Sequence, residues 1–266
     1  AGKKVWAFRP GHFDPSTSGN YMLLSQGAQA WDVSSSDIKL PEKQTRPRRR
    51  AESFPVASEL EGQPLLFHYT RSCPGPWPGQ VLKDYYRSLV EAEADAAHTA
   101  FDALSRILME RRLRASNFLT RGDLKAVSFT AYSPARIKEL IRWRPGLVRW
   151  TFEPYGLAVP LSHMTGLGAE PVIYGNEEVW QTLPREQRFR FQFNRPGAFD
   201  WSKEKEWRVG RDLDLTKIPK SEIKIIVTVA AEALEIAEAH GLQVFLAPGF
   251  DRLNPQRGPQ KNAGLF

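Results

Sequence analysis

The chain has 266 residues, of which 41% are hydrophobic and 25% charged, enough for a sizeable core in one large domain or two small ones. No run of eighteen apolar residues occurs, which argues against a membrane-spanning helix, so we expect no membrane partner. A single cysteine, Cys73, argues against a disulfide framework, and the first residues do not resemble a signal peptide, so we expect a cytoplasmic protein.

The formal net charge is +7, because lysine and arginine outnumber aspartate and glutamate. A surplus of this size favours anionic partners such as DNA, RNA or a phosphate-bearing substrate. The alternative is that the charge serves solubility alone.

Residues 1–60 hold no helical or strand period for long and carry a basic run that ends in Arg48, Arg49 and Arg50. We expect an N-terminal arm that packs on a main domain formed by residues 61–250, followed by a polar tail at 251–266. The basic run is either a phosphate-binding segment or a solvated linker.

Short apolar or alternating runs predict strands, and one long periodic stretch with an acidic interruption near Glu91 predicts two helices between residues 81 and 114. Further helices are predicted at 134–143 and 231–240, the second ending at a Gly241 cap. The predicted strands lie at 65–70, 126–130, 147–152, 156–159, 171–174, 188–194, 205–209, 224–229 and 243–246. Many short strands without a steady βαβ alternation predict an α+β fold with a mixed, mostly antiparallel sheet and flanking helices.

The segment from Glu204 to Val209 is the most informative one for chemistry. If it is a strand, side chains repeat every second residue, so Glu204, Glu206 and Arg208 share one face, the two carboxylates about 7 Å apart. The two carboxylates of such a pair can have different roles. One can stabilise positive charge that develops on a sugar, and the other can orient or deprotonate the incoming nucleophile. The alternative is a solvated edge strand whose glutamates pair with Arg208 and Lys205.

Polar side chains also end two earlier strands. His68, Tyr69 and Thr70 end the first, and Ser128 and Thr130 lie at the end of another, after the helices. Histidine and hydroxyl groups can hold ribose hydroxyls and a carboxamide through directional hydrogen bonds. The alternatives are a packed histidine and ordinary strand hydroxyls.

The order of these motifs resembles that of the ADP-ribosyltransferase superfamily. A strand with His-Tyr-Thr is followed by helices, a strand with Ser-Phe-Thr and a later Glu-x-Glu. Four stretches look more closely like the AbiGi-type abortive-infection proteins, which are related to DarT-like phage-defence enzymes: Phe67–Thr70, Tyr155–Val159, Gly168–Tyr174 and Glu204–Arg208. The resemblance covers residues 64–248. It implies a split sheet, NAD as co-substrate, and a setting in phage defence or a toxin–antitoxin system.

The resemblance also implies roles for individual residues. Glu206 would be catalytic and bind the 2′-hydroxyl of the nicotinamide ribose, and Glu204 would position the acceptor nucleophile. The NAD-binding residues would be His68, Tyr69, Thr70, Ser128 and Thr130. The middle motif, Ser-Phe-Thr at 128–130, departs from that of many relatives because Phe129 stands in place of a second hydroxyl. DarT-like enzymes also use an arginine beside the glutamate, and the candidates here are Arg71, Arg195 and Arg208.

The loop from Asn194 to Trp201 lies where such enzymes recognise their acceptor. Phe199 and Trp201 can stack on a base, and Arg195 can contact phosphate. Arg149, in an Arg- and Trp-rich cluster, is a further candidate for substrate binding. The alternative is that these aromatics belong to the core.

Motifs for other chemistries are absent: the sequence has no G-x-x-x-x-G-K-[ST], G-x-G-x-x-G, H-E-x-x-H or G-x-S-x-G, and no metal site is expected. The sequence therefore predicts an NAD-dependent ADP-ribosyltransferase acting on nucleic acid or protein, with an antitoxin or another defence protein as a partner. A non-catalytic module that binds nucleic acid or a toxin, and an enzyme that only hydrolyses NAD, remain alternatives. The enzymatic hypothesis requires three separated segments to form one pocket in which an ionised glutamate faces the sugar carbon that loses its base. It predicts that the His68 imidazole and the Glu206 carboxylate do not lie on opposite sides of the molecule.

Overall fold

A computed structural model describes residues 54–72, 75–91, 98–117, 120–144, 149–195, 197 and 200–247, together with the short strands β1 (Trp6–Ala7) and β2 (Gln29–Ala30). The chain divides into two compact units, Ala1–Ala51 and Glu52–Phe266. In the first unit, β1 and β2 pair in parallel. The predicted packing of the arm, its basic run and the tail at 251–266 lie outside the described residues.

The second unit is built on a seven-stranded sheet. In spatial order its strands are β15 (Gln243–Leu246), β14 (Lys224–Val227), β8 (Gly156–Pro160), β3 (Leu65–Tyr69), β5 (Val127–Thr130), β12 (Glu206–Val209) and β9 (Glu170–Pro171). Only β14 and β15 pair in parallel, and the other five pairings within this sheet are antiparallel. The predicted mixed, mostly antiparallel sheet is confirmed.

The remaining elements surround this sheet. The helices are α2 (Leu82–Val90), α3 (Ala100–Glu110), α4 (Pro134–Ile137), α5 (Leu161–Gly166), α6 (Glu177–Thr182) and α7 (Ala230–His240). Three small ladders pair β4 (Arg112–Leu113) with β13 (Leu213–Asp214), β6 (Trp143–Arg144) with β7 (Arg149–Trp150), and β10 (Ile173–Gly175) with β11 (Phe191–Phe193). None of the described helices combines the length and apolar character needed to cross a membrane.

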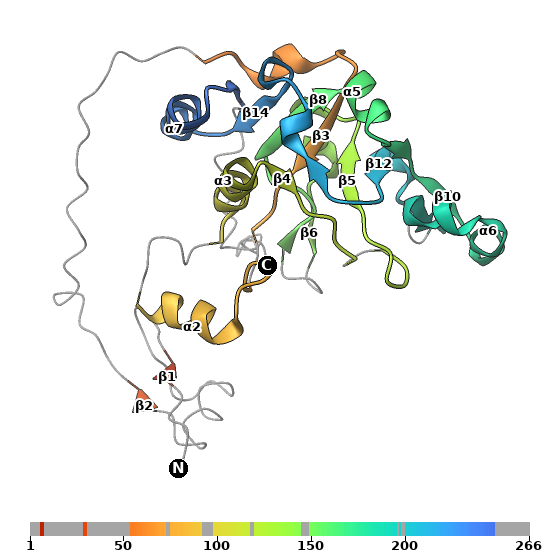
Figure 1. Ribbon diagram of the computed structural model, residues 1–266, viewed down its shortest axis with the longest axis horizontal. Coiled ribbons are helices and arrows are strands. Elements are labelled where there is room, and N and C mark those ends of the chain that lie inside the picture. The colour runs from red at the N-terminus through yellow and green to blue at the C-terminus, as the bar shows by residue number, and fades with distance from the viewer. Residues whose placement is uncertain are drawn as a thin grey trace, which may run out of the picture. The chain divides into compact units, whose positions relative to one another are not determined.

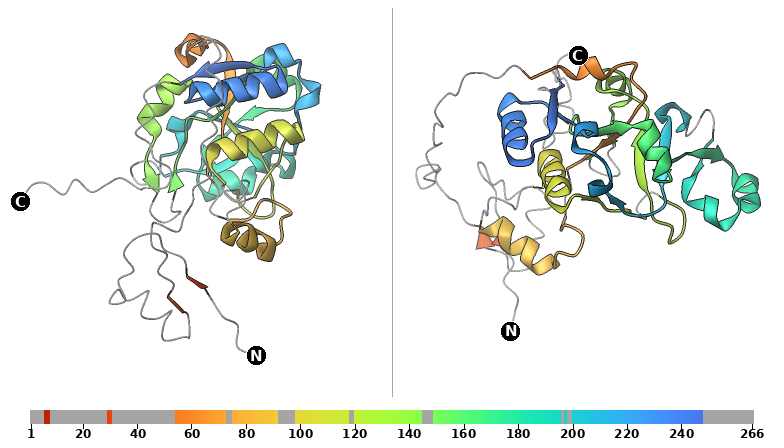
Figure 2. Two further views of the ribbon diagram at one scale, coloured as in Figure 1. Left: turned by 90° about the vertical axis from the view of Figure 1, so that its left-hand side faces the viewer. Right: turned by 45° about the horizontal axis from the view of Figure 1, so that its top comes forward.

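Apolar side chains alternate along the strands, so each face of the sheet has its own core. On one face Leu66, Leu157 and Ile225 pack with residues of α3 and α7, which lie next to each other in Figures 1 and 2. On the other face Phe67 and Ile226 belong to a smaller core. Both cores are needed because the sheet is apolar on both sides.

The ends of α3 and α7 follow ordinary capping chemistry. Thr99 caps α3 through a capping box with Asp102, which satisfies two backbone N–H groups at the start of the helix. Gly241 ends α7 with φ of 63°, as the sequence predicts, because glycine adopts the left-handed conformation without steric cost. The predicted break between two helices is also confirmed, since α2 ends at Val90 and α3 begins at Ala100.

The two halves of the sheet are joined by a single residue pair. All five residues of β3 pair with β8, and all four of β5 pair with β12, but β3 and β5 share only the pair Phe67–Thr130. Beyond that pair, towards Tyr69 and Ser128, no further ladder pairing holds the strands together. The sheet therefore opens between its two central strands.

The N-terminal boundary differs from the expected one. We expected the arm to reach residue 60, but the short 3₁₀ helix Ala57–Leu60 belongs to the second unit. Ala57 and Leu60 are 1% exposed and pack in the smaller core, and Val56 bridges to Leu246 of β15. Burial of these two apolar side chains decides the boundary.

The predicted strand at 188–194 is wrong over its first half. Residues Arg185–Arg190 form a 3₁₀ helix, and only Phe191–Phe193 is a strand. Alternation of phenylalanine with polar residues does not mark a strand here, because Arg188 bonds back to the Leu183 carbonyl and its guanidinium lies over the Trp180 ring. The predicted helix at 134–143 is also too long, since α4 ends at Ile137 and a 3₁₀ turn follows to Leu140.

Gly156 tests the close packing of the central strands. A Cβ atom there would clash with the His68 carbonyl oxygen and lie 3.0 Å from Tyr69 Cα, and backbone atoms inside a sheet cannot move aside. We expect Gly156→Ala to lower the free energy of unfolding by about 2 kcal/mol or more, measured by urea denaturation. Gly166→Ala, where nothing lies within 4 Å, is the control and should not destabilise. Equal stability of the two variants would contradict this account.

Candidate active site

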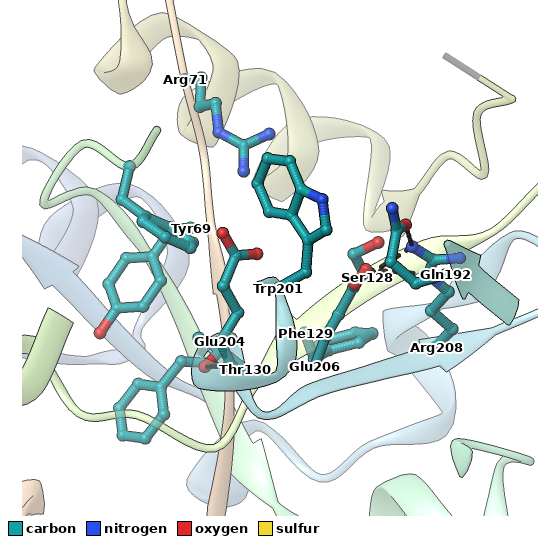
Figure 3. A pocket seen from close by; sticks show the side chains of 12 residues that line it. Tyr69, Arg71, Ser128, Phe129, Thr130, Gln192, Trp201, Glu204, Glu206 and Arg208 are labelled. Atoms are coloured by element: carbon teal, nitrogen blue, oxygen red, sulfur yellow. Dashed lines mark hydrogen bonds and ion pairs between the residues drawn. The ribbon is translucent and has the colours of Figure 1, made fainter. Parts of the chain in front are cut away.

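A pocket lies where the sheet opens between β3 and β5. Its lining comes from β3, β5, β12, the turn before β12, β11 and the segments that follow β3 and β7. The lining residues are Phe67, Tyr69, Arg71, Ser128, Phe129, Thr130, Phe152, Gln192, Trp201, Glu204, Glu206 and Arg208. Figure 3 shows these side chains around the opening. Five stretches of chain that are separated in sequence thus converge on one site.

One side of the pocket is aromatic. The Phe67 and Tyr69 rings are stacked with centroids 6.0 Å apart, and Phe152 meets Tyr69 edge-on at 6.0 Å. The Arg71 guanidinium lies 5.5 Å from the Phe152 ring centroid, and its Nε donates to the Thr151 carbonyl at 2.6 Å. Figure 3 shows Trp201 beside Arg71. This wall can take up a flat apolar group with a cation at its edge.

The other side is organised by the buried guanidinium of Arg208. Its Nε donates to one oxygen of Glu206 at 2.8 Å and its Nη2 to the other at 3.1 Å. Nη2 also donates to Gln192 Oε1 at 2.7 Å, and Nη1 donates to the carbonyls of Phe191 and Phe189 at 2.8 and 3.3 Å. All five N–H groups of the guanidinium therefore have an acceptor, which is what a buried arginine requires.

This bidentate pair fixes the carboxylate of Glu206. The side chain of Arg208 is 2% exposed and that of Glu206 13%, so water screens the pair poorly. Glu206 and Arg208 are two residues apart on β12, and their side chains share a face, as the sequence predicts. On the neighbouring strand Ser128 and Thr130 pair with Arg208 and Glu206 and point to the same face.

The predicted position of Glu204 on that strand is wrong. Ser202–Glu204 is a 3₁₀ turn, Lys205 has φ of 43°, and β12 begins only at Glu206. The Thr130 hydroxyl donates to the Glu204 carbonyl at 2.6 Å and so ties this turn to β5. Glu204 still lines the pocket, but Figure 3 shows its carboxylate directed towards the side of Arg71 and Trp201, away from Glu206.

His68 does not line the pocket. It alternates with Phe67 and Tyr69 along β3 and so belongs to the face of Leu66, and its ring packs against Phe129 at 5.5 Å. Its Nδ1 lies 2.8 Å from the Ser128 carbonyl, to which it donates in the neutral tautomer. Burial, and to a smaller extent the Arg71 charge, lower the pKa of His68 to about 4 despite that bond.

Thr70 also makes structural hydrogen bonds in place of the predicted contact with NAD. Its buried hydroxyl lies 2.7 Å from the Ala100 carbonyl and 3.2 Å from that of Tyr155, and it does not reach the pocket. Tyr69 does line the pocket, and its hydroxyl donates to the Tyr132 carbonyl at 3.1 Å. Of the five residues predicted to bind NAD, Tyr69, Ser128 and Thr130 lie at the pocket, whereas His68 and Thr70 do not.

The four residues predicted to bind the acceptor have different outcomes. Trp201 lines the pocket, and its backbone N–H donates to Asn194 Oδ1 at 2.7 Å. Arg195 is exposed and is not part of the lining. Phe199 and the side chain of Arg149 lie outside the described residues, although the backbone of Arg149 belongs to β7.

Sequence reasoning did not assign a role to Gln192 or Phe152, and it could not choose among Arg71, Arg195 and Arg208. The Glu206-x-Arg208 spacing was the one available signal for the ion pair, since residues two apart on a strand share a face. Gln192 and Phe152 are far from β12 in sequence, and no local pattern connects them with it.

No group of three or more His, Cys, Asp and Glu residues suited to a metal ion occurs within the described part of the chain. No protein-family model matches this chain, and neither a curated protein nor a solved structure matches it significantly. The class of protein must therefore be argued from the pocket.

Removing Arg208 should strongly destabilise the protein, because it leaves a buried carboxylate and two backbone carbonyls without their donor. We expect Arg208→Met to lower the free energy of unfolding by about 3–5 kcal/mol. The double variant Arg208→Met/Glu206→Gln should recover part of that loss, because it removes the unpaired charge. Urea denaturation of both variants and of Glu206→Gln measures the coupling free energy between Arg208 and Glu206. Strictly additive effects of the two substitutions would contradict this account of the pair.

The half-buried imidazole of His68 makes stability depend on pH. Because the folded-state pKa of His68 lies near 4 and the unfolded value near 6.5, the folded protein binds fewer protons. This contribution is fully present above pH 6.5 and is lost as the pH falls towards 4. His68→Gln can still donate to the Ser128 carbonyl but does not titrate. We expect its free energy of unfolding to fall less steeply than that of the wild type between pH 6.5 and 4, and equal slopes would count against the assignment.

Proposed function

We propose that the protein transfers ADP-ribose from NAD to an acceptor, with the reaction centred on Glu206. The observation that carries the proposal is the Arg208-bound carboxylate of Glu206 at a pocket between an aromatic wall and a polar wall. The adjacency of β3, β5 and β12 also supports it, because the resemblance noted in the sequence needs these three segments to form one cleft.

In this proposal Glu206 supports departure of nicotinamide. The bond between the ribose carbon and the nicotinamide nitrogen breaks with its electron pair on nicotinamide, and positive charge develops on the sugar. A fixed carboxylate that accepts a hydrogen bond from the 2′-hydroxyl stabilises that charge without reorganising. Arg208 engages both carboxylate oxygens, so the orientation of the Glu206 carboxylate is fixed.

Glu204 is then the group that handles the acceptor. It lines the same pocket from a different backbone position, the 3₁₀ turn held by Thr130. It accepts the proton of the attacking group while the new bond to the ribose carbon forms. Two carboxylates in different environments thus take different roles.

The aromatic wall supports a substrate with flat rings. Tyr69, Phe152 and Trp201 offer surfaces for a nicotinamide ring or a nucleobase, and Arg71 offers a cation beside them. The net charge of +7 favours a DNA or RNA acceptor over a neutral one. An antitoxin or other defence-protein partner, and a role in phage defence, rest on the sequence resemblance alone.

The role first expected for His68 is not part of the proposal. His68 and Glu206 lie two strands apart in one sheet, and their side chains belong to its opposite faces. The predicted arrangement with both groups in one site is therefore wrong, and the proposal rests on Glu206 and the side chains around it. Contacts to NAD are assigned instead to side chains that line the pocket.

The proposal is tested by incubating the protein with labelled NAD and cellular nucleic acid. We expect Glu206→Gln to lower product formation about 10²–10³-fold through loss of charge stabilisation. Glu204→Gln should also lower it, about 10²-fold or more, through loss of the base. Glu222→Gln, a change in the 3₁₀ turn before β14 and outside the pocket lining, is the matched control and should leave the rate unchanged.

The products separate the alternatives. Labelled nucleic acid or protein identifies a transferase, whereas free ADP-ribose without a labelled acceptor identifies an NAD hydrolase. Salt-sensitive nucleic-acid binding without consumption of NAD identifies a non-catalytic module. Equal product from wild type and Glu206→Gln would exclude Glu206 as the catalytic residue.

A further inference from the structure

The orientation of the Gln192 amide is determined by Arg208. Glutamine can place its oxygen or its nitrogen on either side of the amide plane, and a neighbouring group must select one. Here the Nη2 of Arg208 lies 2.7 Å from Gln192 Oε1. A guanidinium only donates, so the oxygen of the amide must face Arg208 and the NH₂ group must face away.

The NH₂ group of Gln192 is available at the pocket. Gln192 is part of the lining, and Figure 3 shows its nitrogen turned away from the guanidinium. One of its two N–H groups reaches the Phe193 carbonyl at 3.5 Å, which is the outer limit for a hydrogen bond. The other N–H has no acceptor within the described part of the chain and can donate to a bound molecule.

An acceptor stands next to this donor. The same Nη2 atom that binds Gln192 Oε1 also binds one oxygen of Glu206, at 3.1 Å. The Gln192 amide and the Glu206 carboxylate are therefore neighbours on a common support. Both groups line the pocket, Gln192 with a donor and Glu206 with acceptor oxygens, and Ser128 lines it as well.

We propose that Gln192 is a specificity-determining residue that binds the amide group of a substrate. An amide carries a carbonyl oxygen and, in a primary amide or a lactam, an N–H beside it. Gln192 donates to the carbonyl oxygen, and the neighbouring carboxylate accepts from the N–H. This inference rests on the proposed function, which supplies two possible ligands. Nicotinamide carries a primary amide, and some nucleobases carry a lactam edge with the same pair of groups.

Two variants remove the donor in different ways. Gln192→Glu keeps an oxygen for Arg208 but has no N–H, and Gln192→Met removes both polar atoms while Arg208 keeps its bonds to Glu206. Gln187→Glu is the matched control, because Gln187 also accepts from an arginine, Arg190 Nη2 at 3.0 Å, but does not line the pocket.

The measurement is the affinity of each protein for isolated probes by isothermal titration calorimetry. One arm uses nicotinamide with nicotinic acid as the comparison, and the other uses thymidine with N3-methylthymidine. In one of the two arms we expect the wild-type protein to bind the probe with the intact amide, nicotinamide or thymidine, more tightly than its comparison probe. In that arm both Gln192 variants should bind the amide about 10-fold more weakly, and Gln187→Glu should bind like wild type. The arm that shows the loss identifies the source of the amide.

The outcomes separate this inference from the proposed function. If neither Gln192 variant differs from wild type by more than about 2-fold in either arm, the inference is wrong, even where NAD is consumed normally. If the loss of amide binding is seen but wild type forms no product from NAD, Gln192 keeps its role and the transferase proposal fails. A loss that also appears in Gln187→Glu would overturn the inference, because the effect would not be local to the pocket.

Discussion

The site depends on one buried charge, the guanidinium of Arg208. A positive charge that is 2% exposed is tolerated only if every donor finds an acceptor, and here the five acceptors come from Glu206, Gln192 and two carbonyls of the segment 189–191. Satisfying Arg208 therefore fixes three things at once: the orientation of the Glu206 carboxylate, the orientation of the Gln192 amide and the position of β11 against β12. Each of these belongs to the polar wall of the pocket.

The pocket exists because the sheet opens between β3 and β5. A single ladder pair joins these strands, and the Ser128 carbonyl beyond it accepts from the His68 imidazole, a side chain, in place of a backbone N–H. This hydrogen bond joins the two strands beyond their one ladder pair, so the histidine stabilises the opening. The low pKa of His68 keeps the imidazole neutral, which suits a residue packed against Phe129. His68 therefore supports the pocket from behind.

The two glutamates illustrate how backbone position separates chemical roles. They are two residues apart in sequence, yet Glu206 begins a strand and pairs with Arg208, whereas Glu204 ends a 3₁₀ turn that Thr130 ties to β5. The change of direction occurs at Lys205, whose φ of 43° breaks the strand alternation. One carboxylate is held by Arg208 at the polar wall, and the other reaches towards Arg71 and Trp201 (Figure 3). In the proposed reaction this division separates departure of nicotinamide from attack by the acceptor.

The sequence by itself determined the elements whose signal is local: the apolar strands around Leu66, Leu157 and Ile226, the two-helix break after Val90, and the Gly241 cap. It also determined that Glu206 and Arg208 share a face, because strand alternation is a property of the backbone. Only the tertiary structure decided that His68 and Thr70 make structural hydrogen bonds, that Glu204 lies outside the strand, and that Gln192 and Phe152 line the pocket. Those outcomes depend on which buried donors and carbonyls meet across distant segments, and the spacing of residues along the chain does not contain that information.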